Sequence, residues 1–126
     1  MKMQVYPEHC NFYQKDGKLM MHGGELFKMV DRQAAIFCKE LLKGTGLIPL
    51  TVGIDKCQYY YGPLMGETLE VKIKIDSLGK RRITLECQVF GDEGLCFKGY
   101  IAFCSFNNNY QLCPHNLGNN YATSSK

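Results

Sequence analysis

The sequence lacks a long hydrophobic run and lacks paired cysteine motifs. No apolar stretch of signal-peptide length opens the chain, and no later segment is long enough to span a bilayer. Seven cysteines occur, at positions 10, 38, 57, 87, 96, 104 and 113, but the number is odd and no two form a Cys-x-x-Cys pair. Cys38, Cys87 and Cys104 have apolar neighbours, as buried thiols do in a reducing compartment. We therefore expect free cysteines and a cytoplasmic location.

Histidine and clustered positive charge are also scarce. The three histidines, at positions 9, 22 and 115, show no metal-ligand spacing, so no metal or redox cofactor is expected. The net charge is only +3, and the basic residues are scattered apart from Lys80-Arg81-Arg82. This distribution is unlike a nucleic-acid-binding stripe, and it leaves small anionic ligands as possible partners. We expect neither nucleic acid nor membrane as a partner.

What the sequence does contain is one long helical pattern, from about Met21 to Lys43. Its apolar residues recur at helical spacing and form one stripe: Leu26, Phe27, Val30, Ala34, Phe37, Cys38 and Leu41. A glycine pair, Gly23-Gly24, opens the pattern at a point where backbone N–H groups lack intrahelical partners and can face a ligand. Gly44 follows the last turn and predicts the helix end.

Asp31 interrupts the apolar stripe. Phe27 lies four residues before it and Ala35 four residues after it, so all three share one face of the helix. A carboxylate on an apolar face is unfavourable unless it is paired, hydrogen-bonded or used. Four interpretations follow: local pairing with Arg32 or Lys28, a position at the solvated rim, a role between two subunits, or catalysis, because apolar surroundings strengthen a base.

The remaining pattern is mostly β. Residues 2–10 contain a short alternating segment, which Pro7 confines to a sheet edge, and Asn11–Gly17 is a polar loop ending in the turn signal Asp16-Gly17, placed to cover a site at the helix start. Later strands are predicted over residues 47–61, 67–75, 82–90 and 95–106, separated by glycine-containing turns at 76–79 and 91–94. The last three strands form an antiparallel meander.

A single helix flanked by one strand before it and about four after it predicts an α+β fold, in which a curved antiparallel sheet wraps one long central helix. With 126 residues the chain fits one domain. We assign residues 1–106 to this domain and 107–126, rich in Asn and Ser, to a loosely ordered tail. An open sheet edge is often paired with that of a second copy, so dimerisation is expected.

Two motifs in this order resemble the hotdog-fold acyl-coenzyme A thioesterases, in particular the phenylacetyl-CoA and medium-to-long-chain branches. The first motif is His-Gly-Gly-x-Leu-Phe-x-x-x-Asp at residues 22–31, with the acid eight residues after the first glycine. The second is the segment Tyr59–Val71, similar to the family's aromatic-x-x-Pro-x-x-x-Gly-Asp/Glu connection through Pro63, Gly66 and Glu67. In the family pattern, which we match over residues 3–106, the helix is followed by a four-stranded meander.

The resemblance implies hydrolysis of an acyl-CoA thioester to a free acid and coenzyme A. Gly23 would donate its backbone N–H to the thioester carbonyl, where the helix dipole favours an oxyanion. Asp31 would act as general base or as nucleophile, with Gly23 supplied by the other subunit of a homodimer or a dimer of dimers. His22 would position the thioester, although a capping or packing role fits it too. Coenzyme A enters only as part of the substrate.

The further residues follow with alternatives. Gly24 and Tyr61 are candidate substrate-binding residues, although Tyr59, Tyr60 and Tyr61 also suit core or dimer packing. Lys80, Arg81 and Arg82 could meet the coenzyme A phosphates, or form a solvated hairpin.

One position departs from the family pattern. The family usually carries an Asn seven residues before the first glycine, and this position is Asp16 here. Asn11 lies twelve residues before Gly23 and fills the role if the intervening loop bulges out. Asp16 beside Asp31 would instead form a carboxylate pair, and both Asn11 and Asp16 also suit turns.

Two other functions stay open on the same fold. Hydratases and dehydratases of acyl-thioesters usually pair a catalytic His with an acid, and His9 is a weak candidate for that His. A non-catalytic acyl-CoA-binding protein would keep the acyl site but lack a working base. The identity of the acyl chain depends on a tunnel between two subunits, which one sequence does not specify.

Overall fold

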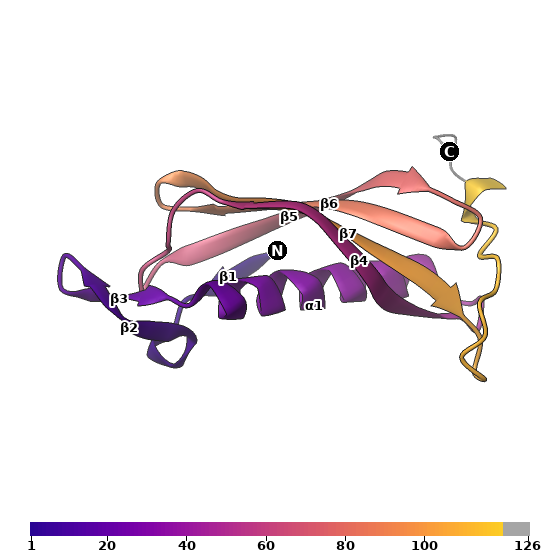
Figure 1. Ribbon diagram of the computed structural model, residues 1–126, viewed down its shortest axis with the longest axis horizontal. Coiled ribbons are helices and arrows are strands. Elements are labelled where there is room, and N and C mark those ends of the chain that lie inside the picture. Colours follow the sequence, from indigo (N-terminus) through magenta and orange to yellow (C-terminus); the bar gives the residue numbers. More distant parts are fainter. Residues whose placement is uncertain (120–126) are drawn as a thin grey trace.

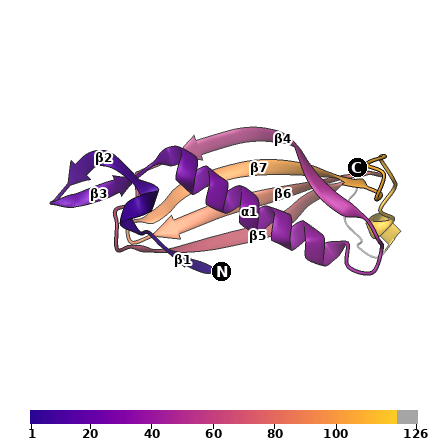
Figure 2. The ribbon, with the colours of Figure 1, turned by 90° about the horizontal axis from the view of Figure 1, so that it is seen from below.

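One long helix lies across the concave face of a curved antiparallel sheet in the computed structural model, which describes residues 1–119 (Figures 1 and 2). The sheet strands are β1 (Lys2–Gln4), β4 (Ile48–Tyr59), β5 (Thr68–Leu78), β6 (Arg82–Gly91) and β7 (Gly94–Phe106). The helix is α1 (Gly23–Leu41), preceded by a separate hairpin of β2 (Cys10–Lys15) and β3 (Lys18–Met21). Two short 3₁₀ turns are η1 (Pro7–His9) and η2 (Leu117–Asn119). The predicted α+β hotdog fold is confirmed.

The sheet order is β1-β5-β6-β7-β4, with every neighbouring pair antiparallel. The predicted meander of β5, β6 and β7 is confirmed. The expectation of a four-stranded meander is wrong at β4, which pairs with β7 and not with β5. The connection over residues 60–67 is long enough to cross three strand spacings, roughly 14 Å at the usual separation. This crossover places β4 at one edge of the sheet.

The helix begins and ends much as its sequence predicts. His22 is the N-cap, and its Nδ1 accepts a hydrogen bond from the Gly24 N–H at 2.9 Å. The helix ends at Leu41, and Gly44 then adopts a φ of +85°, a left-handed conformation that glycine tolerates best. The buried helix residues are Leu26, Met29, Val30, Ala34 and Cys38. They pack on the inner side chains of β6 and β7, which are the buried residues Ile83, Leu85, Val89, Phe97, Ile101 and Phe103.

The N-terminal region contains more regular structure than the sequence suggests. The predicted strand over 2–10 ends at Gln4, before Pro7 starts η1. The predicted loop over Asn11–Gly17 is wrong, because β2 and β3 form a hairpin whose turn is Asp16-Gly17. Both turn residues have positive φ, at +55° and +76°, as a type I′ turn requires. The hairpin projects beyond the start of α1 (Figure 1).

The described part of the expected tail packs back on the sheet. The Ser105 side chain donates a hydrogen bond to the Cys113 carbonyl, and the Cys113 N–H donates to the Ser105 carbonyl at 3.0 Å. His115 and Leu117 are buried. Cys113, His115 and Leu117 thus make contacts that composition does not reveal, and the loosely ordered tail stays a prediction. The rest of that prediction, for 120–126, lies outside the described residues.

Candidate active site

A cavity of about 300 Å³ opens beside the start of α1. Its lining is mostly apolar and aromatic, with one polar amide, and consists of Asn11, Met20, Met21, Gly23, Leu26, Tyr59, Tyr60, Tyr61, Gly62 and Pro63. The N–H of Gly24 is satisfied by His22, but within the described chain the N–H of Gly23 makes no hydrogen bond. A free amide at a helix N-terminus favours a partner with developing negative charge. Gly23 therefore lines this cavity with a backbone amide that is available as a donor.

Tyr59, at the end of β4, holds the carbonyl group of Gly23. Its hydroxyl donates a hydrogen bond to the Gly23 carbonyl at 3.0 Å, and its ring packs edge-on against Phe97 with 5.1 Å between ring centroids. A Cβ added at Gly23 would lie 3.6 Å from the Tyr59 ring. Burial raises the pKa of the Tyr59 hydroxyl, which keeps it protonated and able to donate. Sequence reasoning weighed packing against lining an acyl tunnel for this residue, and it missed the contact with Gly23 because that contact is tertiary.

Asp31 lies two turns along the helix, on the side that faces β4. Its Oδ1 accepts a hydrogen bond from the Thr51 hydroxyl at 3.0 Å, and its side chain is half-buried. No ion pair joins it to Arg32 or Lys28 among the described residues, so local pairing is not how this carboxylate is satisfied. Sequence reasoning missed Thr51, because a threonine on an exposed strand carries no signal for a contact with a helix.

Gly23 and Asp31 do not meet within one protomer. Eight residues separate them, which corresponds to about 12 Å along the helix axis. An attacking group and an oxyanion donor must both lie within roughly 3 Å of one reacting centre. Gly23 and Asp31 of one protomer therefore lie too far apart to act on the same reacting centre.

Strand β4 carries the Asp31 contact and forms an open edge. Its register places Thr51, Ile54 and Tyr59 opposite Phe103, Ile101 and Phe97, whose side chains face the helix. Although Ile54 lies on this inner face, it is 53% exposed, since the helix does not extend over it. The two other exposed aliphatic residues of the strand are Leu50 and Val52. An apolar, unpaired edge strand of this length is a surface that another chain can cover.

The other predicted site residues fall in different places. Asn11 lines the helix-start cavity, and its side-chain oxygen accepts the Tyr13 N–H at 2.8 Å. Asp16 occupies the tip of the projecting β2–β3 hairpin, so the carboxylate pair with Asp31 does not form within a protomer. His22 caps the helix. Tyr61 contributes to the cavity wall, but its hydroxyl contacts the β6–β7 turn, where it accepts the Glu93 N–H at 3.0 Å.

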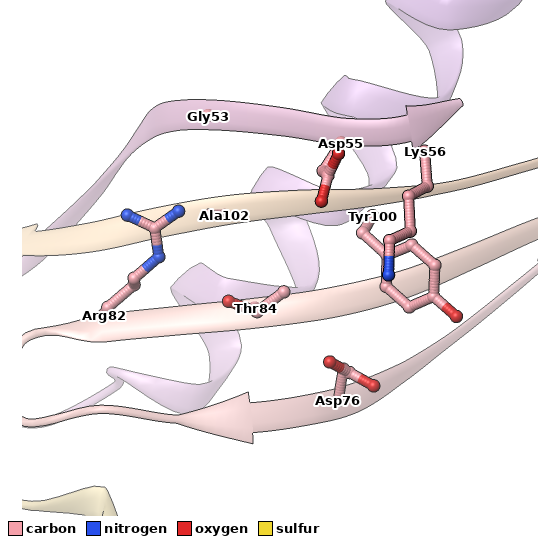
Figure 3. Close-up of a pocket in the computed structure, with 8 residues that line it drawn as sticks. All are labelled: Gly53, Asp55, Lys56, Asp76, Arg82, Thr84, Tyr100 and Ala102. Carbon is pink, nitrogen blue, oxygen red and sulfur yellow. The ribbon is translucent and has the colours of Figure 1, made fainter. Parts of the chain in front are cut away.

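The basic residues lie at the opposite end of the protomer. Lys80 and Arg81 are exposed in the β5–β6 turn, and Arg82 begins β6 in the same row as Cys104 and Leu50, near the end of α1. Arg82 lines a hollow of about 290 Å³ on the outer face of the sheet, with α1 behind the strands (Figure 3). Its other lining residues are Gly53, Asp55, Lys56, Asp76, Thr84, Tyr100 and Ala102. Within one protomer, Lys80, Arg81 and Arg82 are remote from Gly23.

The three buried cysteines are poor nucleophiles. Burial raises the pKa of the Cys38 and Cys87 thiols to about 12 and that of Cys96 to about 11, so these groups stay protonated near neutral pH. Cys57 is more exposed, but its pKa is also raised, chiefly by desolvation. Among residues 1–119 no group of three His, Cys, Asp or Glu side chains is arranged to hold a metal ion.

Comparison with known proteins identifies the family. A model of the thioesterase superfamily matches residues 20–98, which is more than half of the chain. The protein therefore belongs to the thioesterase superfamily. A search of curated protein sequences found no match. In the part of the chain that the structure describes, no helix is both long and apolar enough to cross a bilayer.

Solved structures share the fold at low sequence identity. A hexameric thioesterase from Yersinia pestis is 17% identical, with a TM-score of 0.78 over 90% of this chain and 91% of that one. A mutant of a hexameric broad-specificity acyl-coenzyme A thioesterase is also 17% identical, with a TM-score of 0.80 over 95% and 87%. An acyl-CoA hydrolase from Staphylococcus aureus, in complex with butyryl coenzyme A and coenzyme A, is 20% identical, with a TM-score of 0.77 over 90% and 68%.

Proposed function

We propose that this protein is an acyl-CoA thioesterase that acts as a homodimer, or as a larger assembly of such dimers. The observation that carries the proposal is that one helix presents both an unsatisfied Gly23 amide, beside a largely apolar cavity, and a half-buried Asp31 carboxylate, next to an open sheet edge. Membership of the thioesterase superfamily supports hydrolysis as the reaction. The acyl-CoA names of proteins with the same fold support the substrate class.

The distance along α1 requires a second copy. Because Gly23 and Asp31 of one protomer lie about 12 Å apart along the helix axis, each needs a complementary group from elsewhere. Edge-to-edge pairing of β4 with its copy brings the Asp31 side of one helix toward the partner protomer. A two-fold axis then generates two equivalent sites, each with the glycine of one protomer and the carboxylate of the other.

The chemistry assigned to such a site is acyl transfer to water. The Gly23 N–H donates a hydrogen bond to the thioester carbonyl oxygen and stabilises the charge that develops there. In the general-base route Asp31 removes a proton from the attacking water, the C–S bond breaks, and that proton passes to the departing coenzyme A thiolate. In the nucleophilic route Asp31 attacks the carbonyl carbon and expels the thiolate, which leaves a mixed anhydride on Asp31. Water then hydrolyses the anhydride to the free acid and restores the carboxylate, and the proton released is taken up by the thiolate. Thr51 orients the carboxylate in both routes.

The remaining predicted residues take supporting roles in this proposal. Asn11 and Tyr61 line the cavity beside Gly23, and His22 and Gly24 set the conformation of the helix start. Lys80, Arg81 and Arg82 lie too far from Gly23 of their own protomer to serve it, so they would meet coenzyme A phosphates only from another subunit. Asp16 has no assigned role within a protomer.

The proposal is tested by thiol release from a panel of acyl-CoA esters. We expect activity in the wild type and a loss of about 10²–10⁴-fold in Asp31→Asn, because the base or nucleophile is removed. Asp76→Asn removes a carboxylate from the outer face of the sheet and should leave the rate unchanged. The protein's own cysteines are blocked beforehand, or their background signal is subtracted. Equal rates in the wild type and Asp31→Asn would refute the mechanism, and hydration of an enoyl-CoA without hydrolysis would favour the hydratase class.

A further inference from the structure

Glu67 carries a buried carboxylate for which the described residues offer no cation. It is 9% exposed, and none of the ion pairs found in residues 1–119 includes it. Its two oxygens are instead satisfied by backbone amides. Oε2 accepts the Leu64 N–H at 2.8 Å and Oε1 accepts the Asp92 N–H at 3.0 Å. The carboxylate thus joins the 60–67 connection to the β6–β7 turn.

Tyr61 makes a second link between the same two segments. Its hydroxyl accepts the Glu93 N–H at 3.0 Å, next to the bond that Glu67 receives from Asp92. A Cβ at Gly91 would overlap both the Tyr61 hydroxyl and the Glu67 carboxylate, so a glycine is needed there to admit them. We call Tyr61, Glu67 and the turn 91–94 the clamp.

The clamp is connected to the helix start through the backbone. The loop that Glu67 holds pairs with β3, since the Met21 N–H donates to the Pro63 carbonyl at 2.7 Å and the Met65 N–H donates to the Leu19 carbonyl at 2.8 Å. Strand β3 ends at Met21, and His22 and Gly23 follow directly. Pro63 and Tyr61 also line the cavity beside the Gly23 amide. The position of that amide therefore depends on the clamped loop.

We propose that Glu67 is a positioning residue, which holds the loop 62–66 and β3 so that the Gly23 N–H is aimed into the cavity. This inference rests on the proposed thioesterase function. Glutamine in place of Glu67 keeps one acceptor oxygen, but its amide nitrogen cannot accept the second backbone N–H. One link of the clamp is lost while the size of the side chain is unchanged.

The primary test is Glu67→Gln with acyl-CoA hydrolysis measured per mole of folded protein. We expect kcat to fall about 10-fold or more with KM within about twofold, because the lost interaction acts on the transition state and misplacement of a reacting group is costly. Glu70→Gln, which neutralises a carboxylate three residues along on β5, should keep the wild-type kcat. Glu67→Asp retains the charge and should recover part of the loss. A wild-type kcat in folded Glu67→Gln would overturn the proposal.

Hydrogen–deuterium exchange gives a readout that does not depend on activity. Glu67→Gln should speed amide exchange at residues 19–24 and leave β6 unchanged, whereas unaltered exchange at the helix start would contradict the clamp. If Glu67→Gln does not fold, Tyr61→Phe removes only one hydroxyl and should show the same changes with a fall in kcat on the order of threefold. An inactive wild type would refute the thioesterase function, while faster exchange in the variant would still support the clamp.

Discussion

The two edges of the sheet differ in length, exposure and what they carry. β1 contributes three residues, Lys2–Gln4, and Pro7 follows shortly after it. β4 contributes twelve residues and exposes Leu50, Val52 and Ile54. A short strand with a lysine and a nearby proline is a protected edge, while a long apolar one invites pairing with another chain.

The same difference separates the edge without a site from the edge that carries one. Thr51 and Tyr59, the residues that contact Asp31 and Gly23, both belong to β4. Pairing at β4 would join two sheets and also complete the site between two helices. From this comparison we predict that assembly and catalysis are linked at this edge, and variants at β4 and at β1 test the prediction.

The largest effect is expected from a charge in the middle of β4. Ile54→Glu places a carboxylate on the strand whose edge would pair with β4 of the second copy, so we expect monomers and a loss of activity of at least about 10²-fold, because half of each site disappears. Gln4→Glu adds the same charge to β1 and should change neither property. Light scattering after size-exclusion chromatography and the thioesterase assay measure both. A fully active monomeric Ile54→Glu would show that the site needs no partner.

The second prediction tests whether two protomers share one site. Gly23→Pro removes the amide hydrogen but keeps a helical first turn, since proline is tolerated there and His22 already has an extended ψ of 132°. Alone it should lose about 10²–10³-fold in kcat. Coexpressed in equal amounts with Asp31→Asn, about half of the dimers are mixed and one of their two sites is intact, so about a quarter of the wild-type activity should return.

Native mass spectrometry of differently tagged chains would verify that mixed dimers form. Mixed dimers without recovered activity would mean that Gly23 and Asp31 of different protomers do not act on the same substrate. Mixing Asp31→Asn with itself under two tags is the matched control and should remain inactive.

A smaller effect is expected at the contact between the edge and the carboxylate. Thr51→Val keeps the shape of the side chain but removes the hydroxyl that donates to Asp31. Because the pair is partly solvated, we expect a cost of about 1 kcal/mol in transition-state stabilisation, or roughly fivefold in kcat. Thr45→Val, after the helix, provides a control for loss of a threonine hydroxyl. An unchanged kcat in Thr51→Val would separate Thr51 from the chemistry.

The smallest effect at neutral pH concerns two buried thiols, Cys38 on α1 and Cys87 on β6. Burial raises the pKa of Cys38 and Cys87 to about 12, from an ordinary value of 9.0. Between these values the unfolded chain has lost the thiol protons and the folded chain retains them, so stability is unaffected below pH 9 and falls as pH rises toward 12. Denaturant unfolding at pH 7–11 should show this fall, and Cys38→Ala should reduce its slope. An identical slope in the variant would contradict the assignment.

Local patterns made most of the fold predictable. Helix α1 and the meander follow from periodicity and from glycine turns, because each signal lies within a few neighbouring residues. The β2–β3 hairpin was missed because its residues are mostly polar and only the Asp16-Gly17 turn marks it. The place of β4 beside β7 was missed because register and strand order depend on packing partners that are distant in the sequence.

For the candidate site, sequence patterns indicated positions on the helix but not their contacts. Gly23 and Asp31 lie on one helix and were found from its breaks in pattern, whereas their partners Tyr59 and Thr51 lie on a strand whose alternation shows only which side is covered. Sequence reasoning placed Glu67 only in a family segment. Its side chain accepts hydrogen bonds from the Leu64 and Asp92 amides, and these contacts depend on the tertiary structure. The assignments of all these residues to the reaction stay predictions until the variants are measured.

The anchoring of the described C-terminal segment selects one tautomer of an imidazole. The Leu117 N–H donates to His115 Nδ1 at 3.0 Å, so that nitrogen must present a lone pair, and the ring proton resides on Nε2, which faces the Arg82 carbonyl at 3.3 Å. The described C-terminal segment is thus fastened to the first residue of β6 by this ring.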